Sequence, residues 1–220
     1  EMLYRYGITD MVISPGSRNA PVTIHFSSHN EYQCYSIVDE RSAAFFAMGM
    51  AQSKQQPVAI CCTSGTASAN YYPAIIEAFY QNIPMVIITA DRPENFVDIF
   101  DGQTIRQKEL YKNHIYGSYQ LSESEDDAAI TDNFLTIKKA IQTCILKSGP
   151  VHINIPFSEP LYEQTETIEV NIEQLAQPKP IYNSEKWEPL LTQWNHFDKK
   201  MILVGMQQPN HELKELLEKL

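Results

Sequence analysis

Charged and hydroxyl side chains follow four predicted strands, at the point where each strand ends. The four segments are Ser14-Pro15-Gly16-Ser17-Arg18, Asp39-Glu40-Arg41, Thr63-Ser64-Gly65-Thr66 and Ala90-Asp91-Arg92-Pro93. In open α/β sheets, ligands bind at the carboxyl ends of the strands, so all four segments should open on one edge. The planar forks of Arg18 and Arg92 suit carboxylates. Each arginine taken singly could form a surface salt bridge, but their convergence on one edge favours a binding site.

Glu40 is the candidate for acid–base chemistry. An apolar run ends at Val38, and a helix-like run with apolar residues at helical spacing starts after Glu40. A carboxyl group held in an apolar setting can keep or share a proton. The same stretch is also compatible with Asp39 as an N-cap and Glu40 as a first-turn acid favoured by the helix dipole. Both interpretations remain open from this stretch alone.

Other site classes lack their signatures. The turn from Thr63 to Thr66 resembles an anion-binding turn before a helix, but no lysine follows as in a Walker loop. No G-x-G-x-x-G motif and no serine nucleophile elbow are present. The six histidines have no ligand spacing, and most are interpreted as surface or packing residues; no metal ligand is predicted. The four cysteines form no C-x-x-C pair, which favours buried free thiols in a reducing compartment.

The elements that position these segments alternate between strand and helix. Strands are predicted at 11–14, 33–38, 58–62, 85–89 and 151–155, and helices at 1–6, 20–28, 40–53, 67–80 and 130–146. A long loop with short helices is predicted at 91–118, and long ordered loops tend to be functional. This alternation predicts an α/β fold, a doubly wound parallel sheet with helices on both faces.

The remaining residues indicate a second, incomplete domain. Residues 1–162 form the first predicted domain, and 163–185 lose periodicity and are interpreted as a linker. A helix at 186–197, a strand at 200–205 and a helix at 211–220 are expected to begin a second α/β domain. The chain is therefore expected to be part of a longer protein.

Composition excludes several classes of partner. The chain is 43% hydrophobic and 20% charged, with a net charge of −10 and no basic cluster, so nucleic acid and anionic membranes are poor partners. No apolar run approaches the roughly 18 residues of a membrane span. The helices at 42–51 and 67–79 are apolar nearly all round, which predicts a subunit interface on their outer sides.

Six segments, taken in order, resemble one family. They are Ile13–Arg18, Asp39–Arg41, Thr63–Ala74, Thr89–Pro93, Gln103–Gln107 and Val151–Phe157. This set is similar to the N-terminal part of the MenD family. Its members are thiamine-diphosphate enzymes of menaquinone biosynthesis, the 2-succinyl-5-enolpyruvyl-6-hydroxy-3-cyclohexene-1-carboxylate synthases. The resemblance covers residues 2–162 and implies a thiamine-diphosphate-binding fold, with these residues as its pyrimidine domain and the rest as the start of the central domain.

The resemblance also assigns residues. Glu40 matches the cofactor-activating glutamate, whose carboxyl group bonds a ring nitrogen of the aminopyrimidine. The turn of Thr63, Ser64 and Gly65 is implied to bind beside the pyrimidine. The residues implied to face the substrates are Ser17, Arg18, Arg92 and Gln103. The family often has asparagine before that glutamine, where this chain has Gly102.

The implied activity is that of a transferase, a carboligase that decarboxylates 2-oxoglutarate and joins the remaining unit to isochorismate. The implied cofactors are thiamine diphosphate and Mg2+ (with Mn2+ as a substitute), held through the diphosphate by a C-terminal domain outside this chain. A homodimer or dimer of dimers in the cytoplasm is expected, and this piece alone is expected to be inactive. The alternatives are an acetolactate-type decarboxylase or carboligase and a non-catalytic α/β module.

Overall fold

The computed structural model describes residues 1–162, 187–205, 207 and 209–219. The chain divides into two compact units, Glu1–Lys179 and Pro180–Leu220. The predicted linker at 163–185 lies outside the described residues, so the predicted domain boundaries remain predictions. Among the helices described, none combines the length and apolarity needed to cross a membrane.

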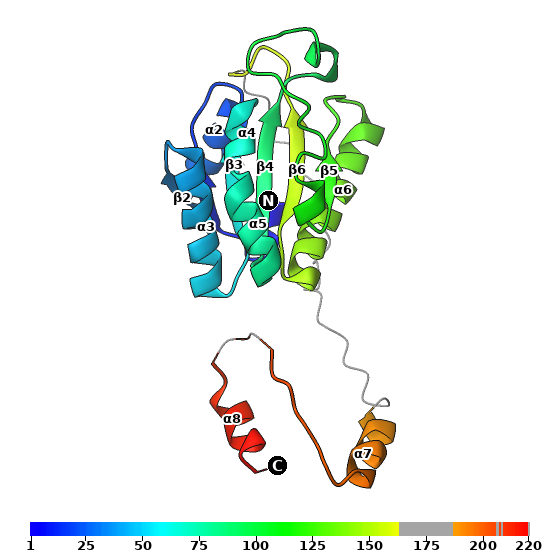
Figure 1. The fold of residues 1–220 in the computed structure, drawn as a ribbon. Coiled ribbons are helices and arrows are strands. Elements are labelled where there is room, and N and C mark those ends of the chain that lie inside the picture. The colour runs from blue at the N-terminus through cyan, green and yellow to red at the C-terminus, as the bar shows by residue number, and fades with distance from the viewer. Residues whose placement is uncertain (163–186, 206, 208, 220) are drawn as a thin grey trace. The chain divides into compact units, whose positions relative to one another are not determined.

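The first unit is built on a six-stranded sheet in which every strand pair is parallel, in the order β2-β1-β3-β4-β6-β5 (Figure 1). The strands are β1 (Asp10–Ile13), β2 (Gln33–Ser36), β3 (Val58–Cys62), β4 (Met85–Asp91), β5 (Ser118–Gln120) and β6 (Val151–Pro156). The helices of this unit are α1 (Met2–Arg5), α2 (Ala20–Ser28), α3 (Glu40–Lys54), α4 (Thr66–Asn70), α5 (Tyr72–Gln81) and α6 (Asp127–Lys147). The predicted parallel sheet is confirmed.

Helices cover both faces of this sheet, as expected for a doubly wound fold. One apolar core joins α1, α2 and α6 to side chains of the sheet such as Met11 and Ile88. The other core lies on the opposite face and joins α3, α4 and α5 to side chains such as Val12 and Ile60. Strands β3 and β4 are buried along their whole length, which explains their continuous apolar sequences.

Two elements of this unit differ in kind or number from the prediction. The single helix predicted at 67–80 is two helices, because Pro73 lacks the N–H that a continuous helix needs at this position. Tyr71, at the junction, is buried and donates its hydroxyl to the carbonyl of Cys61 at 2.7 Å. Strand β5 was not predicted, because its three residues are partly or largely exposed and show no apolar pattern.

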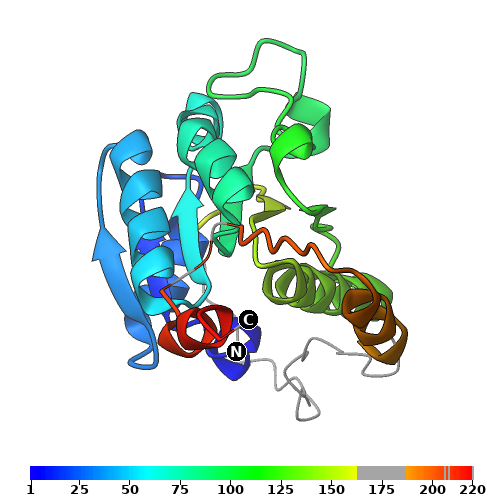
Figure 2. The same cartoon turned by 60° about the horizontal axis from the view of Figure 1, so that its bottom comes forward.

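Loops at the carboxyl ends of the strands form the edge where a site was predicted. The segment between β4 and β5 contains only short 3-10 helices, η1 (Glu94–Phe96) and η2 (Lys112–His114), as predicted. In Figures 1 and 2 the green part of this segment projects beyond the strand ends. Asp39 caps α3 by accepting a hydrogen bond from the Ser42 backbone N–H at 2.7 Å, and this places Glu40 in the first turn.

The second unit contains two helices among its described residues, α7 (Trp187–His196) and α8 (His211–Leu217). The strand predicted at 200–205 is wrong, because these residues form no regular element. Met201 and Leu203 are 85% and 89% exposed. A strand requires a hydrogen-bonded neighbour, and the described residues of this unit supply none, so an apolar sequence alone does not form one.

Candidate functional site

The predicted convergence of the four segments is confirmed, since all lie at or just after the carboxyl ends of parallel strands. The loop of Gly16 and the turn of Thr63 are in such close contact that a Cβ on Gly16 would lie 2.5 Å from Thr63 Cβ. On its other side, the turn touches the long loop, because a Cβ on Gly65 would lie 2.9 Å from the Gln103 carbonyl oxygen. The turn of Thr63 to Thr66 therefore occupies the middle of the edge.

Glu40 is half-buried at the first turn of α3, and it has no hydrogen bond or ion pair with any described residue. Its carboxyl group lies near the end of β3. The pKa of the Cys62 thiol is raised well above its ordinary value by burial, then by the neighbouring Cys61 and to a lesser degree by the charge of Glu40. Val38 beside it is 78% exposed, so the apolar surroundings predicted for Glu40 are only partly supplied by the described residues. Its carboxyl group is free to accept a ligand.

The Ser64 hydroxyl is a second group without a partner. The side chain is 1% exposed, and its oxygen makes no hydrogen bond with the described residues. A buried hydroxyl without a partner costs free energy, so its presence in a native structure calls for an explanation such as a bound water or ion or a catalytic role. Ser64 directly follows β3, in the turn at the middle of the edge.

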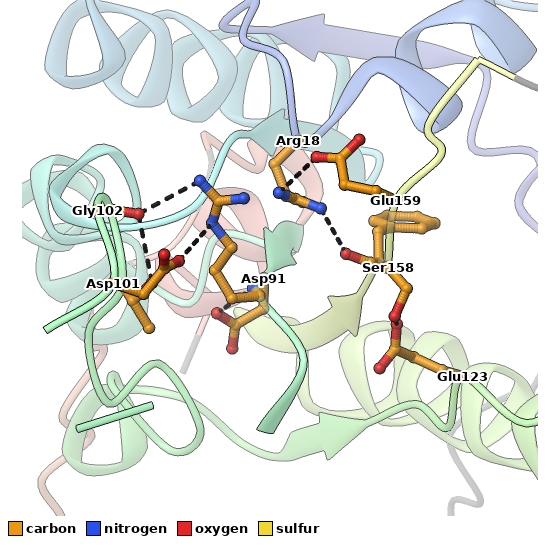
Figure 3. A network of polar contacts seen from close by, with 10 residues as sticks. Arg18, Asp91, Asp101, Gly102, Glu123, Ser158 and Glu159 are labelled. Atoms are coloured by element: carbon orange, nitrogen blue, oxygen red, sulfur yellow. Dashed lines mark hydrogen bonds and ion pairs between the residues drawn. The ribbon is translucent and has the colours of Figure 1, made fainter. Parts of the chain in front are cut away.

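The two predicted arginines open on one cavity of about 310 Å³, lined by Arg18, Arg92, Pro93, Phe96, Asp101, Ser158 and Glu159. Arg18 is 5% exposed, donates to the Phe157 carbonyl at 2.7 Å and pairs with Glu159 at 2.8 Å. Arg92 lies 3.5 Å from the Asp101 carboxylate and donates to the Gly102 carbonyl at 3.3 Å. Figure 3 shows Arg18 and Glu159 on one side and Asp101 and Gly102 on the other.

Acidic partners in this cavity therefore hold the arginines in place. Glu159 is 66% exposed, so a substrate carboxylate can displace it from Arg18 without burying a lone charge. The Nε atom of Arg18 is buried and makes no hydrogen bond with the described residues. The cavity can thus accept an anionic group with planar, bidentate geometry.

Two further predicted residues lie outside this cavity. Ser17 is exposed, and its carbonyl accepts from the Ala20 N–H at 3.1 Å. Gln103 is exposed, with a positive φ of 55°, and meets the turn through its backbone. The described residues give neither side chain a partner in the cavity, so their substrate contacts remain predictions.

A buried polar network beneath the edge was not predicted as part of the site. Asp91, Gln107 and Asn154 are 5%, 1% and 1% exposed. Asn154 donates to Asp91 at 2.7 Å and accepts from Gln107 at 2.8 Å. The signal for it was present in the sequence, because polar residues inside a strand buried on both faces require partners. The alternation of Val151–Pro156 places His152 and Asn154 in such a strand.

This network predicts a specific pH dependence. Burial raises the pKa of Asp91 to about 6 and lowers the pKa of His152 to about 3. Between pH 3.8 and 6 the folded state holds the Asp91 proton more tightly, so stability from this group falls as pH rises. Stability from neutral His152 is instead lost as pH falls from 6.5 towards 3. As pH rises, Asp91 and His152 therefore change the stability of the fold in opposite directions.

Asp91→Asn should remove the loss of stability that Asp91 causes as pH rises from 3.8 to 6. The stability of the variant relative to wild type should therefore increase from about pH 4 to about pH 6 and stay constant above. Thermal unfolding of both proteins across this range measures the difference. A difference that does not change with pH would contradict burial of a titrating Asp91.

Gly65 should tolerate no side chain. Its φ of 80° and ψ of −142° lie in a region almost exclusive to glycine, and the added Cβ would meet backbone atoms. Gly65→Ala should cost about 1–3 kcal/mol of unfolding free energy. Gly102→Ala is the control, because nothing lies within 4 Å of a Cβ there. Equal unfolding free energies for the two variants would show that Gly65 is not constrained.

Comparison with known proteins identifies the fold family. The model of the family described as thiamine pyrophosphate enzyme, N-terminal TPP binding domain, matches residues 1–115, just over half of the chain. The chain belongs to the thiamine pyrophosphate enzymes. The matched residues include the segments from β1 to β4 that form the edge described above.

Three curated relatives are each named 2-succinyl-5-enolpyruvyl-6-hydroxy-3-cyclohexene-1-carboxylate synthase. The protein of Flavobacterium johnsoniae is 50% identical over 204 residues, which cover 90% of this chain and 36% of the relative. That of Christiangramia forsetii is 48% identical over 227 residues, covering 96% and 39%. That of Desulfotalea psychrophila is 42% identical over 218 residues, covering 96% and 40%. The chain spans less than half the length of these relatives.

Proposed function

We propose that the protein is a synthase that uses thiamine diphosphate in menaquinone biosynthesis. The reaction removes CO2 from 2-oxoglutarate and joins the remaining four-carbon unit, equivalent to succinic semialdehyde, to isochorismate. The product is 2-succinyl-5-enolpyruvyl-6-hydroxy-3-cyclohexene-1-carboxylate. Similarity to the synthases of three bacteria over at least 90% of this chain supports the assignment.

The observation that carries this proposal is the position of the two arginines. Arg18 and Arg92 open on one cavity at the strand edge that also bears Glu40. Both substrates carry carboxylates, and arginine forks bind carboxylates with defined orientation. An acetolactate-type enzyme acting on smaller acids has less need of a pair of arginines in one cavity.

Glu40 and Ser64 are the groups of this chain that would hold the pyrimidine of the cofactor. Ser64 follows β3, the Glu40 carboxyl group lies near the end of that strand, and neither side chain has a partner among the described residues. When bound, thiamine diphosphate supplies the carbon nucleophile that attacks the keto carbon. Glu40 would hold a proton at a pyrimidine ring nitrogen, and Gly65 lets the turn approach the ring closely.

The proposed function also includes a Mg2+ ion and a second subunit. The described residues contain no cluster of three or more His, Cys, Asp or Glu side chains that could hold a metal. We place Mg2+ and the cofactor diphosphate on a C-terminal domain of a second subunit. Phe45 and Phe46 on α3 and Tyr80 on α5 are 42%, 43% and 66% exposed, which supports a homodimer through these helices. The proposed location of this homodimer is the cytoplasm.

Turnover by the intact protein tests the assignment. The protein is supplied with thiamine diphosphate, Mg2+, 2-oxoglutarate and isochorismate, and the loss of isochorismate absorbance is followed. Turnover that requires 2-oxoglutarate is the expected result. Activity with pyruvate alone would instead assign an acetolactate-type reaction, and absence of activity with any 2-oxo acid would favour a non-catalytic module.

A further inference from the structure

We propose that Gln107 is a positioning residue that fixes the turn of Thr63 to Thr66 against the loop that carries Arg92. Its side chain is 1% exposed and reaches three segments that are distant in sequence. It accepts from the Gly65 backbone N–H at 3.1 Å. It donates to the Ala90 carbonyl at 2.9 Å and to Asn154 Oδ1 at 2.8 Å.

The chemistry of the partners allows only one orientation of this amide. A backbone N–H can only donate and a carbonyl can only accept, so Gly65 must face Gln107 Oε1 and Ala90 must face Nε2. The two strong bonds thus fix the Gln107 rotamer. Each atom of the amide has a defined partner, and no alternative flip satisfies them.

The hydrogen bond from Gln107 also fixes the orientation of the Asn154 amide. Since its Oδ1 accepts from Gln107, its Nδ2 must donate, and it does so to Asp91 at 2.7 Å and Gln120 at 2.9 Å. Asp91 accepts in turn from the Arg92 backbone N–H at 2.8 Å. Gln107 is therefore connected to the arginine loop twice, directly through Ala90 and indirectly through Asn154.

The chain of bonds ends at a histidine whose tautomer it determines. The Thr89 hydroxyl donates to Asn154 Oδ1 at 2.7 Å, so it must accept from His152 Nε2, which lies 2.7 Å away. His152 is then neutral with its proton on Nε2, in agreement with the burial that lowers its pKa to about 3. Each donor from Gln107 Nε2 to His152 Nε2 therefore has a defined acceptor.

The inference deepens the proposed function and rests on it, because the two elements that Gln107 joins are the cofactor turn and a substrate arginine. Gln107 itself lies below both and is separated from solvent. Its effect on the reaction is therefore geometric. Loss of the amide should change how well cofactor and substrate are held, beyond any loss of stability.

Gln107→Met tests this in the intact protein. Methionine has a similar length and none of the three bonds. We expect at least tenfold weaker binding of thiamine diphosphate in the presence of Mg2+, measured by titration calorimetry. We also expect a drop of at least tenfold in kcat/KM, and faster hydrogen exchange of the Gly65 amide, measured well below the unfolding temperature.

Lys54→Met is the matched control. Lys54 donates to both oxygens of Asp10 at 2.7 Å, at the opposite edge of the sheet where β1 begins. It should lower the unfolding temperature and leave cofactor affinity, kcat/KM and Gly65 exchange unchanged. A purely structural role for Gln107 predicts that the two variants behave alike.

Gln107→Glu keeps the proposal testable if the methionine variant does not fold. Its carboxyl group can still accept from Gly65 N–H but, with at most one proton, cannot donate to both Ala90 and Asn154. The Gly65 amide should stay protected while kcat/KM falls. Unchanged kcat/KM in Gln107→Glu would overturn the proposal, as would unchanged Gly65 exchange and kcat/KM in Gln107→Met if that variant folds.

The positioning role of Gln107 and the proposed function can be contradicted separately. If wild type turns over and Gln107→Met retains its cofactor affinity and kcat/KM, the positioning role is wrong and the proposed function stands. If wild type does not act on isochorismate but Gln107→Met weakens thiamine diphosphate binding tenfold, the proposed function is wrong and the positioning role stands.

Discussion

Glu40→Gln should lower turnover of 2-oxoglutarate and isochorismate by the intact protein at least about 100-fold. Glutamine has the same size and can still form a hydrogen bond, but it cannot hold or release a proton. Glu40 is half-buried in the first turn of α3 and has no partner among the described residues, so the substitution breaks no bond seen there. The fold should therefore be retained, and the loss should fall on kcat.

Asp39→Asn is the matched control for Glu40→Gln. Asp39 is the adjacent carboxylate and caps α3 through the Ser42 N–H at 2.7 Å. Asparagine caps helices as well as aspartate, so this variant should keep activity within a few-fold of wild type. Full activity of Glu40→Gln would leave Glu40 as a first-turn acid and would falsify the proton-holding role. If both variants lost activity, the cause would be a disturbed start of α3 and not the missing proton on Glu40.

Arg18→Lys should lower kcat/KM for one of the two substrates about 100-fold, which corresponds to about 3 kcal/mol. Arg18 uses one nitrogen on the Phe157 carbonyl at 2.7 Å and another on Glu159 at 2.8 Å. Lysine keeps the charge, but its ammonium group cannot hold the carbonyl and present a second, parallel donor to a carboxylate. Separate titrations of 2-oxoglutarate and isochorismate identify which substrate Arg18 binds.

Arg106→Lys serves as the control for Arg18→Lys. The Arg106 side chain is 81% exposed and pairs with Asp98 at 2.9 Å on the surface of the long loop. Surface pairs of this kind contribute little, so kcat/KM should change less than twofold. If Arg18→Lys also left kcat/KM for both substrates unchanged, the cavity of Arg18 and Arg92 would not be the substrate site.

Local sequence determined the architecture of the first unit. Continuous apolar runs mark strands buried on both faces, and helical spacing marks the covering helices, so β3 and α2 were predicted at their observed bounds. Parallel connections then require that the ends of neighbouring strands meet. This is why the segments of Arg18, Thr63 and Arg92 could be placed on one edge before any contact was known.

Apolar periodicity predicted an element less well where that element depends on its neighbours. The strand predicted at 200–205 has an apolar sequence but no hydrogen-bonded partner among the described residues. Pro73 divides the helix predicted at 67–80, although apolar spacing continues through it. In both cases the pattern reports which side chains prefer burial, while the backbone bonds decide the element.

Only the tertiary structure decided which polar groups meet beneath the edge. Gln107 lies 42 residues from Gly65 and 47 from Asn154, and Asn154 lies 63 from Asp91. The sequence alone determined that residues 151–155 form a strand and that Glu40 begins a helix at a strand end. It could not determine which partners Gln107, Asn154 and Asp91 find, because hydrogen bonds between distant segments depend on how the sheet, the turn and the long loop pack together.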